Sequence, residues 1–398
     1  MQHSNYFLTT KPLRRLFLLI ACSAASSFAN DAVVKLRGGM DFQIGCYSHD
    51  EKTASEDSAP NKRHSALNST AYVAVDARNT LDSGFVYGAQ VNLGTTARNT
   101  RKLSSFLYTE SSAGRWELGS NKSANATMKI TGYSNACATS GGWDMWIKTD
   151  PAKRDVIYLT NFGNFLDQKT RHADHAEYSR KVTYYTPKLK NFQFGISYVP
   201  DTRNVGYKGL NDPEYHNPVK NGYDLAVKHA VALGVTHEYE SVSGVKIRTA
   251  VVGEMGKPIQ REKEGRPIVK FDKLRTYTVG TEISYKNASV AMAYANYMKS
   301  LTSASIDTLG RNTSVYGATG RYNHSDKLSY SLSHLCGKHK ATNINATTLA
   351  AEYKVAPGIL PYIEVTYYKT SGKFLNRGVI TNDGHKGGLL LLGAKLEI

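Results

Sequence analysis

The sequence predicts an all-β fold: a closed antiparallel transmembrane β-barrel of about 16 strands, with one long loop folded into the lumen. The first observation is that short runs of alternating apolar and polar residues recur along nearly the whole chain. The second is that tight turns alternate with longer polar loops. The third is the number of strands, because an open sheet of this size would leave two unpaired edges that closure removes.

The clearest run is the hairpin at residues 180–201. Its polar join, residues 187–191, contains Pro187 and predicts a tight turn between antiparallel strands. In the second strand one face is aromatic or aliphatic and the other is polar: Phe192, Phe194, Ile196 and Tyr198 against Gln193, Gly195 and Ser197. Period-two alternation of this kind indicates a strand with different surroundings on its two sides.

Residues 1–29 read as a secretory signal peptide, which leaves 30–398 as the barrel domain. Three basic residues precede an apolar run, and small residues lead to a cleavage site after Ala29. Two alternatives lie within this segment: a lipoprotein box that would leave a lipidated Cys22, and a twin-arginine signal at Arg14-Arg15. All three readings predict export from a bacterial cytoplasm.

The remaining strands follow in order. In the first, residues 33–47, Val34, Leu36, Met40, Phe42 and Ile44 oppose Lys35, Arg37, Asp41 and Gln43. Further strands are expected at 70–80, 85–95, 104–110, 115–120, 225–239, 245–254, 274–285, 289–297, 314–322, 328–335, 347–355, 360–368 and 387–398. A basic loop is expected at 98–102, and polar loops at 48–67, 201–222 and 257–272.

The alternation stops between residues 121 and 177. A connection this long inside a compact fold is usually functional or disordered. Its apolar residues, among them Trp143, Trp146 and Phe162, indicate that it packs against something, and we expect the two tryptophans to anchor it to the barrel wall.

Composition excludes several classes of protein. Removing Lys11, Arg14 and Arg15 with the signal peptide lowers the formal net charge from +17 to +14. Export and the scatter of the basic residues make nucleic acid an unsuitable partner. The three cysteines that remain, Cys46, Cys137 and Cys336, form neither a disulfide framework nor a metal-binding spacing. A soluble β-sandwich also has alternating strands, but its strands would not all carry charges on one face and aromatic residues on the other.

The chain resembles the Gram-negative general diffusion porins over nearly its whole mature length. Their hairpin after the third loop is similar to RKVTYYTPKLKNFQFGISYVPD, and their first strand to VKLRGGMDFQIG. Their second hairpin is similar to DARNTLDSGFVYGAQVNL, and the strand that enters their third loop to GRWELGS. One departure is the last residue, because those proteins end in an aromatic residue and this chain ends in Ile398.

The resemblance implies an outer-membrane homotrimer that passes small hydrophilic solutes and ions without catalysis. Residues 121–177 would then be the constriction loop. The expected pore-lining residues are the wall cations Lys35, Arg37, Arg78, Arg115 and Lys181 and the loop carboxylates Asp144, Asp150 and Asp155. Weak anion preference is expected from the net charge. No catalytic constellation, metal site or cofactor motif is identifiable, and the alternatives are a surface adhesin or a substrate-specific channel on the same barrel.

Overall fold

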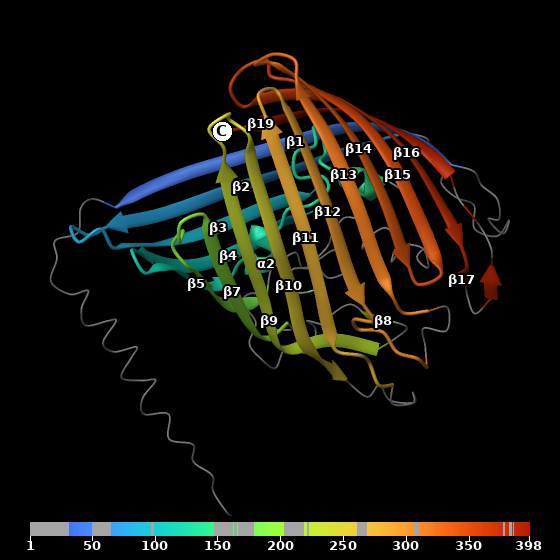
Figure 1. The fold of residues 1–398 in the computed structure, drawn as a ribbon, viewed down its shortest axis with the longest axis horizontal. Helices are drawn as coiled ribbons and strands as arrows, with labels where there is room; N and C mark the ends of the chain where they lie inside the picture. The colour runs from blue at the N-terminus through green and yellow to red at the C-terminus, as the bar shows by residue number, and fades with distance from the viewer. Residues whose placement is uncertain are drawn as a thin grey trace, which may run out of the picture.

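Sixteen strands form a closed antiparallel barrel, which confirms the predicted barrel (Figure 1). The computed structural model describes residues 32–49, 65–96, 99–146, 162, 165, 179–202, 219–220, 223–260, 269–305, 310–376, 379–381, 384 and 386–398. Neighbouring strands in the sequence are neighbours in the barrel, and the last strand pairs with the first from Gly39 opposite Glu397 to His49 opposite Gly387. The sheet contains a seventeenth strand of two residues that pairs only with the start of the next strand.

The strands in the first half are β1 (Val33–His49), β2 (Ser65–Thr80), β3 (Val86–Thr96), β4 (Asn99–Ser111), β5 (Gly114–Ser120), β6 (Arg180–Tyr185), β7 (Phe192–Asp201), β8 (Val219–Lys220) and β9 (Tyr223–Glu240). Those in the second half are β10 (Lys246–Gln260), β11 (Leu274–Tyr285), β12 (Ala288–Met298), β13 (Thr313–Asn323), β14 (Leu328–His339), β15 (Thr342–Tyr353), β16 (Ile359–Gly372) and β19 (Lys386–Glu397). A separate hairpin joins β17 (Phe374–Asn376) to β18 (Val379–Thr381), and two short helices, α2 (Ala124–Met128) and η1 (Gly142–Trp146), follow β5.

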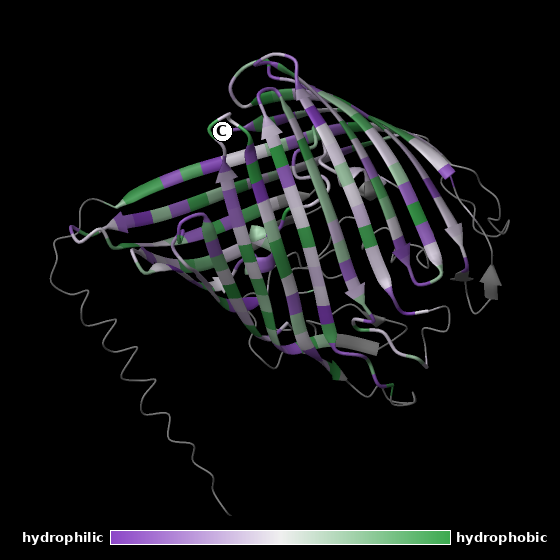
Figure 2. Cartoon of the chain, in the orientation of Figure 1, coloured by the Kyte–Doolittle hydropathy of each residue, from purple (hydrophilic) through white to green (hydrophobic). Residues whose placement is uncertain are grey.

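The alternation seen in the sequence separates the two faces of the wall. On β7 the outward residues Phe192, Phe194 and Ile196 are each 44% exposed, whereas the inward Ser197 is buried. Hydrophobic and hydrophilic residues alternate along the strands in Figure 2. An apolar outer surface opposite a polar inner one is the arrangement of a barrel that meets lipid outside and water inside.

Aromatic residues gather at the outer face near the short turns. They include Tyr87, Trp116, Tyr184, Tyr239, Tyr285, Tyr322, Tyr330 and Tyr353. A second set lies farther along the strands, toward the other end: Tyr198, Tyr277, Tyr294, Tyr316 and Tyr367. The side chains between the two sets are mainly aliphatic, as on β16, where Ile363 and Val365 precede Tyr367. Two aromatic girdles around an apolar band mark the two interfaces of a membrane.

Among the described residues, no helix has the length and apolar character needed to cross a membrane.

Strands extend beyond the sequence expectation at several long-loop ends; β10, for example, continues to Gln260, into the polar loop expected at 257–272. β2 begins at Ser65, five residues earlier than expected, and β4 begins at Asn99, so most of the expected basic loop at 98–102 is strand. β14 and β15 extend to meet in a two-residue turn, Lys340-Ala341. The predicted alternation of short and long connections therefore fails at the β3–β4 and β14–β15 joins. The proposed signal peptide, including Cys22, lies outside the described residues.

Candidate functional site

The described part of the segment after β5 lies against the inner face of the wall. Small residues on that face allow the close approach. A Cβ on Gly280 of β11 would lie 2.2 Å from the carbonyl oxygen of Ile130, and one on Gly317 of β13 would lie 3.0 Å from the ring of Phe162. Gly195 and Gly234, paired on β7 and β9, leave room for the side chain of Met128 in α2. We call these four residues the glycine track.

Three successive backbone N–H groups bind side chains from three successive strands. Cys137 donates to Ser331 Oγ on β14 at 2.9 Å, Ala138 to Glu352 Oε2 on β15 at 3.1 Å, and Thr139 to Glu364 Oε2 on β16 at 3.0 Å. The Thr139 hydroxyl also donates to Glu364, at 2.7 Å. The Lys395 ammonium on β19 donates to the Ala138 carbonyl. We call residues 137–139 the latch.

The left-handed backbone of Ala138, at φ 53°, turns the three N–H groups toward the wall. Hydrogen bonds from N–H groups to a carboxylate are stronger than those to a neutral acceptor. Glu364 is 1% exposed, so these donors offset part of the cost of burying its carboxyl group. Burial, with a smaller contribution from Glu352, raises the pKa of the Cys137 thiol, which keeps this cysteine protonated in the docked latch.

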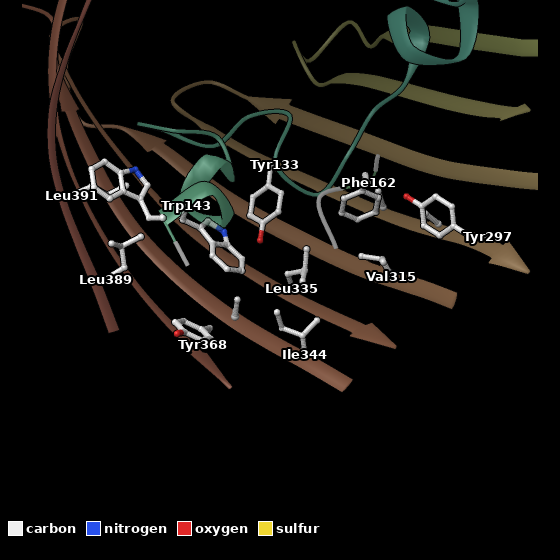
Figure 3. Packing of buried hydrophobic residues seen from close by; sticks show 14 residues of the cluster. Tyr133, Trp143, Phe162, Tyr297, Val315, Leu335, Ile344, Tyr368, Leu389 and Leu391 are labelled. Carbon is white, nitrogen blue, oxygen red and sulfur yellow. The ribbon is translucent and has the colours of Figure 1, made fainter. Parts of the chain in front are cut away.

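Aromatic residues hold the rest of the segment. The Trp146 indole N–H donates to Gln43 Oε1 on β1 at 2.9 Å, and its ring occupies the space that a Cβ on Gly45 would need. Trp143 is 1% exposed and stacks on Tyr368, with ring centroids 6.4 Å apart. Figure 3 shows the Trp143 ring beside Leu335 and Ile344 of β14 and β15. The prediction that the two tryptophans anchor this segment to the wall is confirmed.

The five predicted wall cations all lie on inner-face positions, but their surroundings differ. Lys35, Arg37 and Arg78, on β1 and β2, make no ion pair with another described residue; Lys35 and Arg37 are exposed and Arg78 is half-buried. Arg115 is bound to Glu117 at 2.8 Å and to Glu110 at 3.3 Å, and it stacks on Tyr108. Lys181 is 3% exposed and donates to the Asn121 carbonyl. The structure therefore brings only the first three together as accessible charges.

The side chains of the three predicted loop carboxylates are not among those that the structure describes. Asp144 belongs to η1, but its side chain is outside the described set, and Asp150 and Asp155 lie outside the described residues altogether. Their opposition to the wall cations stays a prediction.

Sequence reasoning missed the inner-face residues that bind the segment: Ser197, Glu254, Ser289, Ser331, Glu352 and Glu364. Alternation already placed them on the polar face. Glu364 could have been identified because it is a carboxylate in the middle of a wall strand. Such a carboxylate needs a hydrogen-bond or ion-pair partner once it is buried.

The inner-face carboxylates of β1 and β2 are also engaged. The Tyr362 hydroxyl donates to Asp41 at 2.8 Å, and the Tyr108 hydroxyl donates to Asp76 at the same distance. Within the part of the chain that the structure describes, no group of three or more His, Cys, Asp or Glu residues could hold a metal ion. The site is a polar lumen lined by charges.

Comparisons with known proteins agree with this architecture. The family model of the Gram-negative porins matches residues 17–373. An uncharacterized protein of Rickettsia conorii is 28% identical over 415 residues, which cover 92% of this chain and 93% of that protein. An uncharacterized protein of Rickettsia bellii is 27% identical over 441 residues, covering 97% and 100% of the two chains.

Solved structures share the fold at low sequence identity. An anion-selective porin from Comamonas acidovorans is 13% identical, with a TM-score of 0.58 over 92% of this chain and 100% of that one. A loop-deletion mutant of OmpT, an outer membrane protein of Vibrio cholerae, is also 13% identical, with a TM-score of 0.55 over 93% and 100%. The closed sixteen-strand barrel, its apolar outer face and the match over most of its length show that the chain belongs to the Gram-negative porins.

Proposed function

We propose that this porin forms a water-filled channel with weak anion preference. Membership of the family and the barrel fold support an outer-membrane channel for passive diffusion. The observation that carries the ion preference is the cluster of Lys35, Arg37 and Arg78 on the lumen side of β1 and β2. These cations have no ion-pair partner among the described residues, whereas Asp41 and Asp76 beside them accept hydrogen bonds from tyrosines.

Lys35, Arg37 and Arg78 act on ions through the electric field in the lumen. Rings of charged side chains set the ion selectivity of pores, and a low-dielectric wall strengthens their field. Arg115 contributes less, because Glu110 and Glu117 offset its charge. The Comamonas porin with the same fold is described as anion-selective, which is consistent with the proposal.

Single-channel recording in a planar lipid bilayer tests both parts of the proposal. Stepwise openings establish the channel, and the reversal potential in a salt gradient gives the ion preference. We expect the sign of an anion-preferring pore from the wild type and a shift toward cations from K35E/R37E/R78E. Arg115→Gln should shift it much less. Clear cation preference in the wild type contradicts the proposed selectivity while leaving the channel intact.

The segment at 121–177 narrows the channel in this proposal, with Asp144, Asp150 and Asp155 facing the wall cations. The anchoring of residues 121–146 to the inner face supports it. Asp150→Asn and Asp155→Asn should each increase anion preference. Unchanged reversal potentials in both variants would remove these carboxylates from the selectivity site.

We also propose that the exported chain begins at Asn30 and assembles as a homotrimer. A related fold, OmpT of Vibrio cholerae, is described in a trimer form. Mass spectrometry of the intact complex gives the subunit number, and mass spectrometry of the first peptide distinguishes a free Asn30 from an acylated Cys22.

A further inference from the structure

Charge on the outer face of the second half of the barrel has one sign. On β11–β16 and β19, which the structure describes in full, the outward charged residues are Arg275, Lys338, Lys369 and Lys386. No Asp or Glu side chain is outward on these strands; Glu282, Glu352, Glu364 and Glu397 occupy inward positions. All four cations lie within four residues of the strand end opposite the β11–β12, β13–β14 and β15–β16 turns.

Three of these cations form a continuous surface with two asparagines. Lys338 on β14 is opposite Asn343 on β15, Asn345 is opposite Lys369 on β16, and Lys369 is opposite Lys386 on β19. All five side chains are exposed. We call these five residues the lysine–asparagine patch.

The patch lies at the level of a lipid headgroup. Lys369 follows the girdle residue Tyr367 by two positions on the same face of β16, and Lys338 lies at the same distance beyond Cys336, which is opposite the girdle residue Tyr316. Aromatic girdles sit at the membrane interface, so the next outward residues reach the headgroups. In barrels of this kind the longer loops are extracellular, which places the patch in the outer leaflet.

An apolar depression adjoins the patch on the membrane side. It has a volume of about 440 Å³ on the outer face of β11–β14, and its lining includes Met292, Tyr294, Tyr316 and Ala318. His334 and Cys336 form its border toward the patch. His334 shares hydrogen bonds with Thr347 at 2.9 Å and Cys336 at 3.2 Å, which reduces the cost of these polar groups in the apolar band. The depression accommodates part of an acyl chain.

We propose that the lysine–asparagine patch binds the phosphate-bearing headgroup of an anionic lipid, with an acyl chain in the adjoining depression. The lysines supply the charge, and the side-chain amides of Asn343 and Asn345 donate hydrogen bonds to phosphate or hydroxyl oxygens. The inference rests on the proposed membrane placement of the barrel and is independent of its ion selectivity.

Native mass spectrometry of the mature protein in mild detergent tests the site. The probes are phosphatidylglycerol, which is anionic, and phosphatidylcholine, which has a phosphate but no net charge. We expect the wild type to retain phosphatidylglycerol preferentially. K338Q/K369Q should weaken that binding about thirty-fold, equivalent to about 2 kcal/mol at 1.4 kcal/mol per tenfold. K338R/K369R should retain it.

The matched control removes the same charge from the opposite rim. K286Q/K327Q, in the short turns after β11 and β13, should bind phosphatidylglycerol as the wild type does. Equal retention of both lipids by the wild type, or equal losses in the two glutamine variants, overturns the proposal. Displacement of the lipid by millimolar inorganic phosphate would indicate a small-anion site and also overturns it.

Conductance separates this inference from the proposed function. K338Q/K369Q should keep the single-channel current and the reversal potential of the wild type, because both residues are outside the lumen. If the variant does not fold, the comparison of the two lipids on the wild type decides alone.

Discussion

Glu364→Ala should release the latch. The substitution leaves the Thr139 N–H and hydroxyl without their acceptor at a position where Glu364 is 1% exposed. An unsatisfied buried donor costs about 1–3 kcal/mol. Two such donors make the docked latch less stable by about 3 kcal/mol, which raises its open fraction about a hundredfold.

Cys137 reports that opening, because it is 1% exposed and lies two residues from Thr139. The assay is the rate of maleimide labelling in a C46S/C336S background, which removes the exposed and the partly exposed cysteine. When opening and closing are fast relative to labelling, the rate follows the open fraction. Opening also restores an ordinary pKa to the thiol, since burial raises it in the docked state. More thiolate is then present at neutral pH, and labelling accelerates further.

Two controls define the result. Glu110→Ala removes a lumen carboxylate that contacts Arg115 and no latch residue, so its labelling rate should equal that of the background. Glu364→Gln keeps one acceptor oxygen and should give an intermediate rate. Equal rates in Glu364→Ala and the background protein would refute the role of Glu364. The role of Glu364 would also be refuted if Cys137 of the wild-type protein were labelled as fast as the exposed Cys46.

Three further outcomes follow from the same structure. Gly280→Ala places a Cβ 2.2 Å from the Ile130 carbonyl and should also speed Cys137 labelling. Gly320→Ala, with open space around the new Cβ, should leave the labelling rate unchanged. Equal labelling rates in the two variants would argue against the glycine track. Trp116→Ala removes a girdle ring whose centroid lies 4.6 Å from that of Tyr184. The free energy of unfolding in liposomes, measured by urea titration, should fall by about 1–2 kcal/mol. A stability equal to that of the wild type would contradict the assigned girdle. Gln43→Ala removes the acceptor of the Trp146 indole N–H. In a W116F/W143F background, which leaves Trp146 as the one tryptophan of the chain, the fluorescence should shift toward longer wavelength as water reaches the ring. An unshifted spectrum would mean that packing alone holds the ring.

The strand pattern was predictable wherever the two faces differ. At residues 192–198 aromatic and polar residues alternate without interruption, and β7 has the expected faces. The pattern failed near the long-loop ends, where Lys338, Asn343 and Asn345 are outward and polar. The inward Ile344 between the two asparagines is apolar and buried, so the expected contrast of an apolar outer face and a polar inner face is reversed there.

The contacts of the latch were not predictable from local sequence. Cys137 and Ser331 are 194 residues apart, and Thr139 and Glu364 are 225 residues apart. Alternation shows that Ser331 and Glu364 are inward, but many inward residues share that property. Which of them meets the segment depends on the barrel's closed geometry, which no single strand encodes.

The segment after β5 also crosses the line where the barrel closes. Ala138 binds Lys395 on the last strand, and Trp146 binds Gln43 on the first. These two strands come from opposite ends of the chain, and their pairing is the step with the greatest loss of chain entropy. A strut inside the barrel thus joins both sides of its seam, so the element that partly occupies the lumen also resists the opening of the barrel. Mutations selected for a wider pore in this segment should therefore be recovered together with a lower melting temperature.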